Sequence, residues 1–238
     1  IMELPPGLND EQKTLSIKEI NASMPQLLKE SNEWTCQIAR EHPQLVPFIA
    51  LDPSILTASE MESHIKEMAD RGARGVKMHP VLQNIYMHDE RMLRVWETAR
   101  ELGFSIIAHS GPSKGDPQYA EPDAFSQILT ALPGLPIVLA HMGGGGAWRQ
   151  CLDIAQAFPD ACFDLCEIIE WCGAPNAPTT QELAKLILDV GYERVLFGSD
   201  FPWYDIEHTK ELVLELPILA KEQKEAILGA NAVRILGI

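Results

Sequence analysis

The sequence is short of positive charge and of long apolar runs, and these shortages exclude whole classes of protein. Its 19 Lys and Arg stand against 34 Asp and Glu, giving a formal net charge of −15. Nucleic acid or an anionic membrane surface would repel such a chain. No run approaches the roughly 18 apolar residues that span a bilayer. We therefore expect a small-molecule substrate as the partner, neither nucleic acid nor membrane, and leave homo-oligomer formation open.

Cysteine is scarce as well. There are five cysteines, an odd number, and Cys162, Cys166 and Cys172 match no Cys-x-x-Cys pattern of a zinc site. We interpret them as small apolar side chains whose thiols stay reduced, which is typical of a cytoplasmic protein. The sequence opens with Ile1 instead of Met. This opening predicts that sequence is missing upstream.

What the sequence does contain is a series of short apolar runs at regular intervals. Each run ends at a polar residue, and the successive spacings between these residues are 27, 30, 32, 26 and 33. Such intervals are typical of repeated strand–helix units. The runs are Leu45–Leu51, Gly75–Met78, Phe104–Ala108, Ile137–Ala140, Cys162–Leu165 and Val195–Phe197, and the polar residues after them are Asp52, His79, His109, His141, Glu167 and Asp200.

Helical periodicity fills the intervals between the runs. Over 89–103 the apolar residues fall on one face, and Gly103 is a stop signal. A helix is also predicted over Gln26–Arg40, with a weak strand over Leu15–Ile20 before it. The same periodicity predicts helices over 59–71, 122–132, 147–158, 179–190 and 207–228, the last broken near Pro217.

Alternating strands and helices predict an α/β protein with a parallel sheet. A doubly wound sheet would carry its chemistry at one switch point, whereas a barrel brings every carboxyl strand end to one mouth. Nearly every run here ends in a reactive side chain, which favours a (β/α)8 TIM-barrel-like parallel barrel. Because only six strands are found, we expect the first two strands to be absent from this chain. Residues 1–238 are interpreted as a single barrel domain made of units three to eight.

The motifs "VKMHP", "IIAHSG", "VLAHMGGG" and "LFGSDFPW", with the terminal "ILGANAVRILGI", resemble the amidohydrolase superfamily. More narrowly, they are similar to its amidohydrolase-2 group of metal-dependent TIM-barrel hydrolases and decarboxylases. The resemblance covers about residues 34–238. It implies a distorted (β/α)8 barrel with one divalent metal, commonly zinc. Within these motifs His109 and Asp200 match metal ligands, and His141 matches the residue that assists the metal-bound water or the substrate.

The chain departs from the family at one metal motif. The family's first strand ends in His-x-His, and none of the seven histidines here stands two residues from another. The resemblance therefore provides only His109 and Asp200 as metal ligands, and it predicts weak metal occupancy. Imidazole and carboxylate suit zinc, which lowers the pKa of a bound water toward ~7. Asp200 could both hold the metal and accept a proton, or it could simply cap the next helix.

Several residues near these motifs are candidates for contacting a substrate. Lys77 and His79 share one strand face by the period of two, and we predict that both bind substrate. A buried ion pair for Lys77 and simple packing for His79 are the alternatives. Trp203 is predicted to bind substrate and, with Phe201, to keep water out. The glycines of 143–146 and the nearby Arg149 could contact an acid group, or the glycines could form a merely flexible loop. We expect His42, His64, His88 and His208 to be solvated.

The predicted function is that of a metal-dependent hydrolase. Asp200 and His141 would be catalytic, and the substrate would be a small carboxylated lactone, ester or amide attacked by metal-activated water. One alternative is a non-oxidative decarboxylase of an aromatic or unsaturated acid on the same scaffold. A second alternative is a catalytically inactive barrel fragment. Decarboxylase relatives tend to carry an acidic residue soon after the histidine that matches His141, and "HMGGGGAW" has none, which favours the hydrolase.

Overall fold

Six parallel strands form one sheet in the order β1-β2-β3-β4-β5-β6. The computed structural model describes residues 10–112 and 118–237. Neighbours in the sheet are neighbours in the chain, with no reversal of order, as in a barrel and unlike a doubly wound sheet. The predicted parallel, barrel-like α/β fold is confirmed. The strands are β1 (Phe48–Ala50), β2 (Gly75–Met78), β3 (Ser105–His109), β4 (Ile137–Ala140), β5 (Ala161–Asp164) and β6 (Val195–Leu196).

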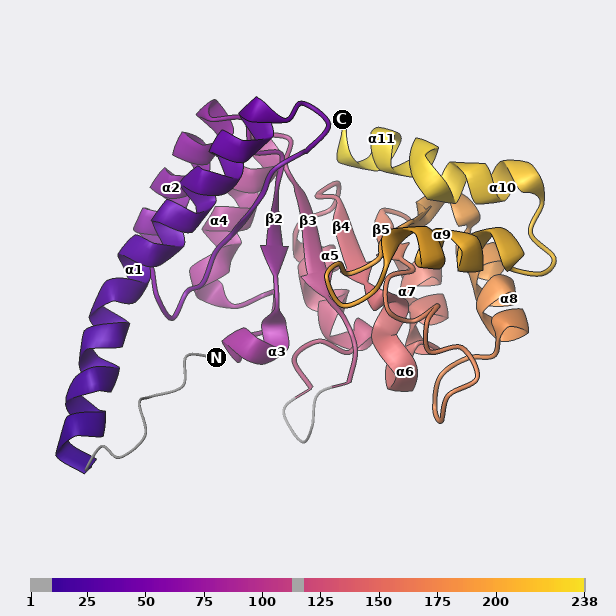
Figure 1. Cartoon of the computed structure of the whole chain (residues 1–238), viewed down its shortest axis with the longest axis horizontal. Coiled ribbons are helices and arrows are strands. Elements are labelled where there is room, and N and C mark those ends of the chain that lie inside the picture. The colour runs from indigo at the N-terminus through magenta and orange to yellow at the C-terminus, as the bar shows by residue number, and fades with distance from the viewer. Residues whose placement is uncertain (1–9, 113–117, 238) are drawn as a thin grey trace.

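The helices follow the predicted periodicity closely. Two of them begin at a capping box, where Thr57 pairs with Glu60 and Thr179 with Glu182. In Figure 1, α1, α2 and α4 lie together beside one end of the sheet, while α9, α10 and α11 lie toward the other. The helices are α1 (Asp10–Glu41), α2 (Ala58–Asp70), α3 (Pro80–Gln83), α4 (Glu90–Glu101), α5 (Ser126–Ala131), α6 (Gly144–Ala147), α7 (Gln150–Ala157), α8 (Thr180–Val190), α9 (Ile206–Glu215), α10 (Lys221–Glu225) and α11 (Asn231–Leu236). Short 3-10 turns occur at Pro122–Phe125, His141–Gly143 and Tyr192–Arg194, and a π-helical turn at Ala226–Ala230.

The weak strand predicted over Leu15–Ile20 is wrong, because these residues belong to α1. Lys18 and Glu19 favour helix and interrupt the apolar residues, so the segment simply extends the helix that begins upstream. The lower part of α1 runs past the body of the molecule (Figure 1). Of the helices in residues 10–112 and 118–237, none is long and apolar enough to cross a membrane.

The core is divided by the two faces of the sheet. Val76, Ile106 and Ile137 stand in register and belong to the main buried cluster, together with Met68 of α2 and Trp96 of α4. The other face carries a smaller cluster of Val138, Cys162 and Leu196, against which Ile235 of α11 packs. Lys77 is in register with Ile107 and thus lies on this second, inner face. The inner face therefore leads from apolar packing to the polar carboxyl ends of the strands.

Candidate active site

A cavity of about 500 Å³ opens at the carboxyl ends of the strands. The six residues that were predicted from the sequence to form the site all line this cavity. The cavity thus brings together strand ends that are more than a hundred residues apart in the sequence. Three further residues, Leu82, Glu167 and Tyr204, line it as well. The predicted residues are Lys77, His79, His109, His141, Asp200 and Trp203.

Three of the lining residues have a left-handed backbone. The φ angles are +66° at His141, +64° at Glu167 and +54° at Asp200, each just after a strand. Side chains with a Cβ rarely adopt this region, and each such residue costs on the order of 1–3 kcal/mol. Asp200 does not cap the next helix, because Asp205 does so by accepting from the N–H of His208 at 2.9 Å. The capping alternative for Asp200 is therefore excluded.

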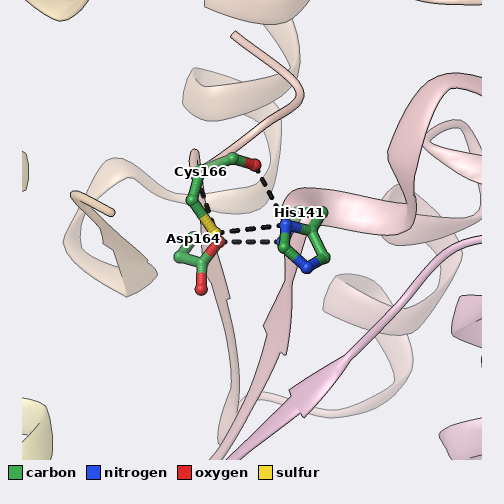
Figure 2. A group of neighbouring side chains, drawn as sticks. All are labelled: His141, Asp164 and Cys166. Atoms are coloured by element: carbon green, nitrogen blue, oxygen red, sulfur yellow. Dashed lines mark hydrogen bonds between the residues drawn. The ribbon is translucent and has the colours of Figure 1, made fainter. Parts of the chain in front are cut away.

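His141 is held by residues at and just after the end of β5. Asp164 Oδ1 accepts from the backbone N–H of His141 at 2.8 Å and from the Cys166 thiol at 2.6 Å. The ring Nδ1 of His141 lies 3.2 Å from both the carbonyl oxygen and the sulfur of Cys166 (Figure 2). Burial first, and then the Asp164 carboxylate, raise the pKa of the Cys166 thiol well above its usual range, so it remains a hydrogen-bond donor. These contacts leave Nε2 as the nitrogen that is free for chemistry.

Glu167 is a candidate functional residue that was not among those predicted from the sequence. Its Oε2 lies 3.4 Å from His141 Nδ1, so an acid and an imidazole meet at the cavity wall. Burial raises the pKa of the Glu167 carboxyl, and the neighbouring carboxylates of Asp200 and Asp164 raise it further against the opposing effect of His141. The signal available in the sequence was that Glu167 follows an apolar run, as the other site residues do.

The remaining histidines form a stack. The rings of His79 and His109 are nearly parallel, 11° apart in plane, with centroids separated by 4.0 Å, and His109 meets His141 edge-on at 4.8 Å. Burial, followed by the neighbours His79, His141 and Lys77, lowers the pKa of His109 to about 3. Burial and Lys77 also lower the pKa of His79. At neutral pH His109 is therefore uncharged, with a ring nitrogen lone pair available to a ligand.

The cavity has donors that fit a divalent metal. One donor atom each from His141, Glu167 and Asp200 lie within 4.8 Å of one another. Imidazole and carboxylate form a donor set that suits zinc and manganese. A second group of His141, Asp164 and Cys166 is equally close but is fully buried and already joined by hydrogen bonds. The cavity group therefore fits an ion better than the buried one does.

Some expectations about the surroundings are wrong. Phe201 and Trp203 are 70% and 80% exposed, so they do not seal the cavity, although Trp203 lines its rim. Arg149 stacks on Trp148 at 3.9 Å and lies near Glu182, outside the set that lines the cavity. These aromatic and basic residues were assigned to the site because they lie close to site residues in the sequence. The turns after the strands direct their side chains to the surface instead.

Two other sequence interpretations have clear outcomes. Cys162 and Cys166 are buried, as expected for small apolar side chains, but Cys166 also contacts His141. His64 is 3% exposed and not solvated, because the face of α2 that carries it packs toward α1.

A family model described as amidohydrolase matches residues 8–238. A gamma-resorcylate decarboxylase of Rhodococcus jostii (strain RHA1) is 33% identical over 96 residues, which are 36% of this chain and only 29% of that relative.

Solved structures share the fold at lower identity. An uncharacterised TIM-barrel protein from Bordetella bronchiseptica superposes with a TM-score of 0.73 and 22% identity, over 87% of this chain and 72% of that chain. A dihydroxybenzoic acid decarboxylase from Polaromonas sp. JS666, with bound manganese and the inhibitor 2-nitroresorcinol, gives a TM-score of 0.66 and 20% identity, over 91% and 76%. At these identities the likeness concerns the TIM-barrel fold alone.

Proposed function

Because the chain belongs to the amidohydrolase family, we propose that it decarboxylates a small acid whose carboxylate is attached to an aromatic or unsaturated carbon. The observation that carries this proposal is the contact between His141 and Glu167 inside a cavity that also contains Lys77. Loss of carbon dioxide without oxidation requires a proton donor at the carbon that loses the carboxylate. The paired imidazole and acid provide one. The local match to a decarboxylase supports the same reaction.

The contact also bears on one reason for preferring hydrolysis. That preference rested in part on the lack of an acidic residue shortly after His141 in the sequence. Glu167 stands 26 residues later, yet its carboxylate approaches the His141 ring from the neighbouring strand end. The acid that decarboxylation needs is thus near in space although it is distant in sequence.

Each side chain has a defined part in the proposed reaction. The Lys77 ammonium attracts the substrate carboxylate into an otherwise acidic protein, and His79 and Trp203 contact the rest of the molecule. His141 delivers a proton from Nε2 to the carbon that bears the carboxylate. The bond to the carboxylate then breaks, carbon dioxide leaves, and the bonding pair stays with the ring. Glu167 stabilises the charged imidazole before the transfer, and solvent restores the proton.

We propose His109 and Asp200 as ligands of a divalent metal, in keeping with the family resemblance. When bound, such an ion polarises oxygen groups of the substrate. The uncharged His109 ring and the Asp200 carboxylate suit this task, and they leave His141 and Glu167 for proton transfer. Zinc and manganese both suit these donors. Residues 1–238 would act as a single barrel domain on this small-molecule substrate.

The test is an isotope experiment on the full chain with added Mn²⁺ or Zn²⁺. Carboxyl-labelled ¹³C 2,6-dihydroxybenzoate in D₂O should yield ¹³CO₂ and one deuterium at the vacated ring carbon, and His141→Asn should abolish both. A panel of lactones, esters and amides in H₂¹⁸O is run in parallel. Incorporation of ¹⁸O without carbon dioxide release would overturn the proposal in favour of hydrolysis. Neither product, across a panel of hydroxybenzoates, would favour an inactive barrel.

A further inference from the structure

A second cavity of about 290 Å³ adjoins the polar one and shares His109 and Glu167 with it. Its other walls include Pro112, Trp171, Pro175 and the glycines of α6. We propose that this cavity is a subsite for a flat apolar substituent, so that the substrate is an aryl- or alkenyl-substituted acid. This inference rests on the proposed function in one respect. The acid group of the substrate would bind in the polar cavity, near Lys77.

The chemistry of the second cavity suits an uncharged group. Among the described residues that line it, Glu167 and His109 are the only acidic or basic side chains, and both also line the polar cavity. The Ser110 hydroxyl already donates to the carbonyl of Ala140 at 2.6 Å and accepts from the N–H of Gly143 at 3.0 Å. Apart from Ser110, the exposed Asn176 and the glycine backbone, the rest of the uncharged lining is Pro112, Trp171 and Pro175, and an apolar ring against these walls would gain about 25 cal/mol for each Å² of apolar surface that it buries.

Rings form much of the wall of the second cavity. A Cβ on Gly145 would lie 3.1 Å from Trp171 Cε3, and one on Gly146 would lie 2.9 Å from Pro112 Cγ. The absence of a side chain at these glycines thus lets the backbone pack directly against both rings. The cavity is lined by the indole of Trp171 and the rings of Pro112 and Pro175, and aromatic groups pack favourably against such rings.

The Trp171 wall is also held in place. Its Nε1–H donates to the hydroxyl of Tyr204 at 2.8 Å, and Tyr204 lines the polar cavity. This hydrogen bond ties the loop after β5 to the loop after β6, at the boundary between the two cavities. A ring that is oriented before the ligand arrives costs less conformational entropy on binding. The two cavities therefore form one extended site with a polar and an apolar end.

The experiment compares 2-hydroxybenzoate with its 4-phenyl and 5-phenyl derivatives as ligands of the full chain, using isothermal titration calorimetry. At least one phenyl derivative should bind about tenfold more tightly than the parent acid, the gain expected from burying part of one ring. Trp171→Leu should reduce that preference to within about twofold, because the phenyl derivative should lose much more affinity than 2-hydroxybenzoate does. Trp34→Leu, on an exposed tryptophan of α1, is the matched control and should change neither affinity.

Trp171→Phe keeps an aromatic wall but loses the bond to Tyr204, and it should retain part of the preference. The indole N–H signal of Trp171 in NMR should shift with the phenyl derivative and not with the parent acid. Equal affinities for all three acids, or an equal loss for all of them in Trp171→Leu, would overturn the subsite. A phenyl preference without any carbon dioxide release would overturn the proposed reaction and leave the subsite standing.

Discussion

The Asp164 carboxylate at the end of β5 holds the backbone of His141 at the end of β4, with 2.8 Å between Oδ1 and the His141 nitrogen. The same oxygen accepts from the N–H of Cys166 at 3.2 Å and from its thiol. One buried oxygen thus fixes two strand ends in the conformation that turns the His141 ring toward the cavity. The left-handed backbone at His141 would otherwise be unfavourable.

Replacing Asp164 should therefore destabilise the fold. Asp164→Ala leaves two buried N–H groups without an acceptor, and we expect the free energy of unfolding to fall by about 2–4 kcal/mol. Asp164→Asn keeps an acceptor oxygen and should lose roughly half as much. Urea unfolding measures both, with Asp160→Ala, at an exposed position before β5, as the control. A loss no larger in Asp164→Ala than in Asp160→Ala would contradict this role.

Glu167 should matter for turnover and little for substrate affinity. Glu167→Gln cannot stabilise the charged His141 ring, so kcat for decarboxylation should fall by about 10²-fold or more with KM nearly unchanged. His141→Asn should lose at least as much, and the double variant should lose little more than His141→Asn alone because the two residues act as a unit. Glu215→Gln, on an exposed residue of α9, is the control. Full turnover in Glu167→Gln would remove Glu167 from the mechanism.

The amount of metal bound by variants should distinguish the proposed metal ligands, His109 and Asp200, from the proposed proton-transfer residues. The chain lacks His-x-His, so we expect less than one bound ion per chain by elemental mass spectrometry after dialysis against Mn²⁺ or Zn²⁺. Asp200→Asn and His109→Ala should lose most of this metal, whereas Glu167→Gln and the control Asp160→Asn should keep it. If Glu167→Gln loses metal as Asp200→Asn does, the ion is held by the His141, Glu167 and Asp200 group instead.

His64 should make stability depend on pH. Asn32 accepts from the N–H of Ala50 through Oδ1, so its amide nitrogen faces the ring and donates to His64 Nε2 at 3.0 Å. That nitrogen must stay unprotonated, and burial lowers the pKa of His64. The unfolded chain therefore binds more protons, and the free energy of unfolding should decline as the pH falls below about 6.5 toward the lowered pKa of the folded state.

Urea midpoints between pH 7.5 and 5 measure this decline. His64→Gln should flatten it, since the replacement cannot take up the proton, whereas His42→Gln, on an exposed residue, should leave the slope as it is. An unchanged slope in His64→Gln would show that the dependence comes from other groups.

The sequence by itself determined the strands, the order of the sheet and the residues at its mouth. Apolar runs of three to seven residues and helical stripes between them are local patterns, and their length and spacing suffice to predict a parallel sheet. Once the strands run in parallel, the residue after each one must lie at the same edge. For this reason His79, His109, His141 and Asp200 could be assigned to one cavity without coordinates, and Lys77 could be added because it shares a strand face with His79.

Only the tertiary structure decided how those side chains pair. The contact of Glu167 with His141 and that of Asp164 with Cys166 depend on the register of neighbouring strands and on left-handed backbone turns, which no one-dimensional pattern encodes. Burial of His64 and exposure of Trp203 likewise follow from which helix face or loop side meets the body of the protein. A sequence pattern fixes the element that carries a side chain, whereas the packing of elements against one another fixes the atoms that it meets.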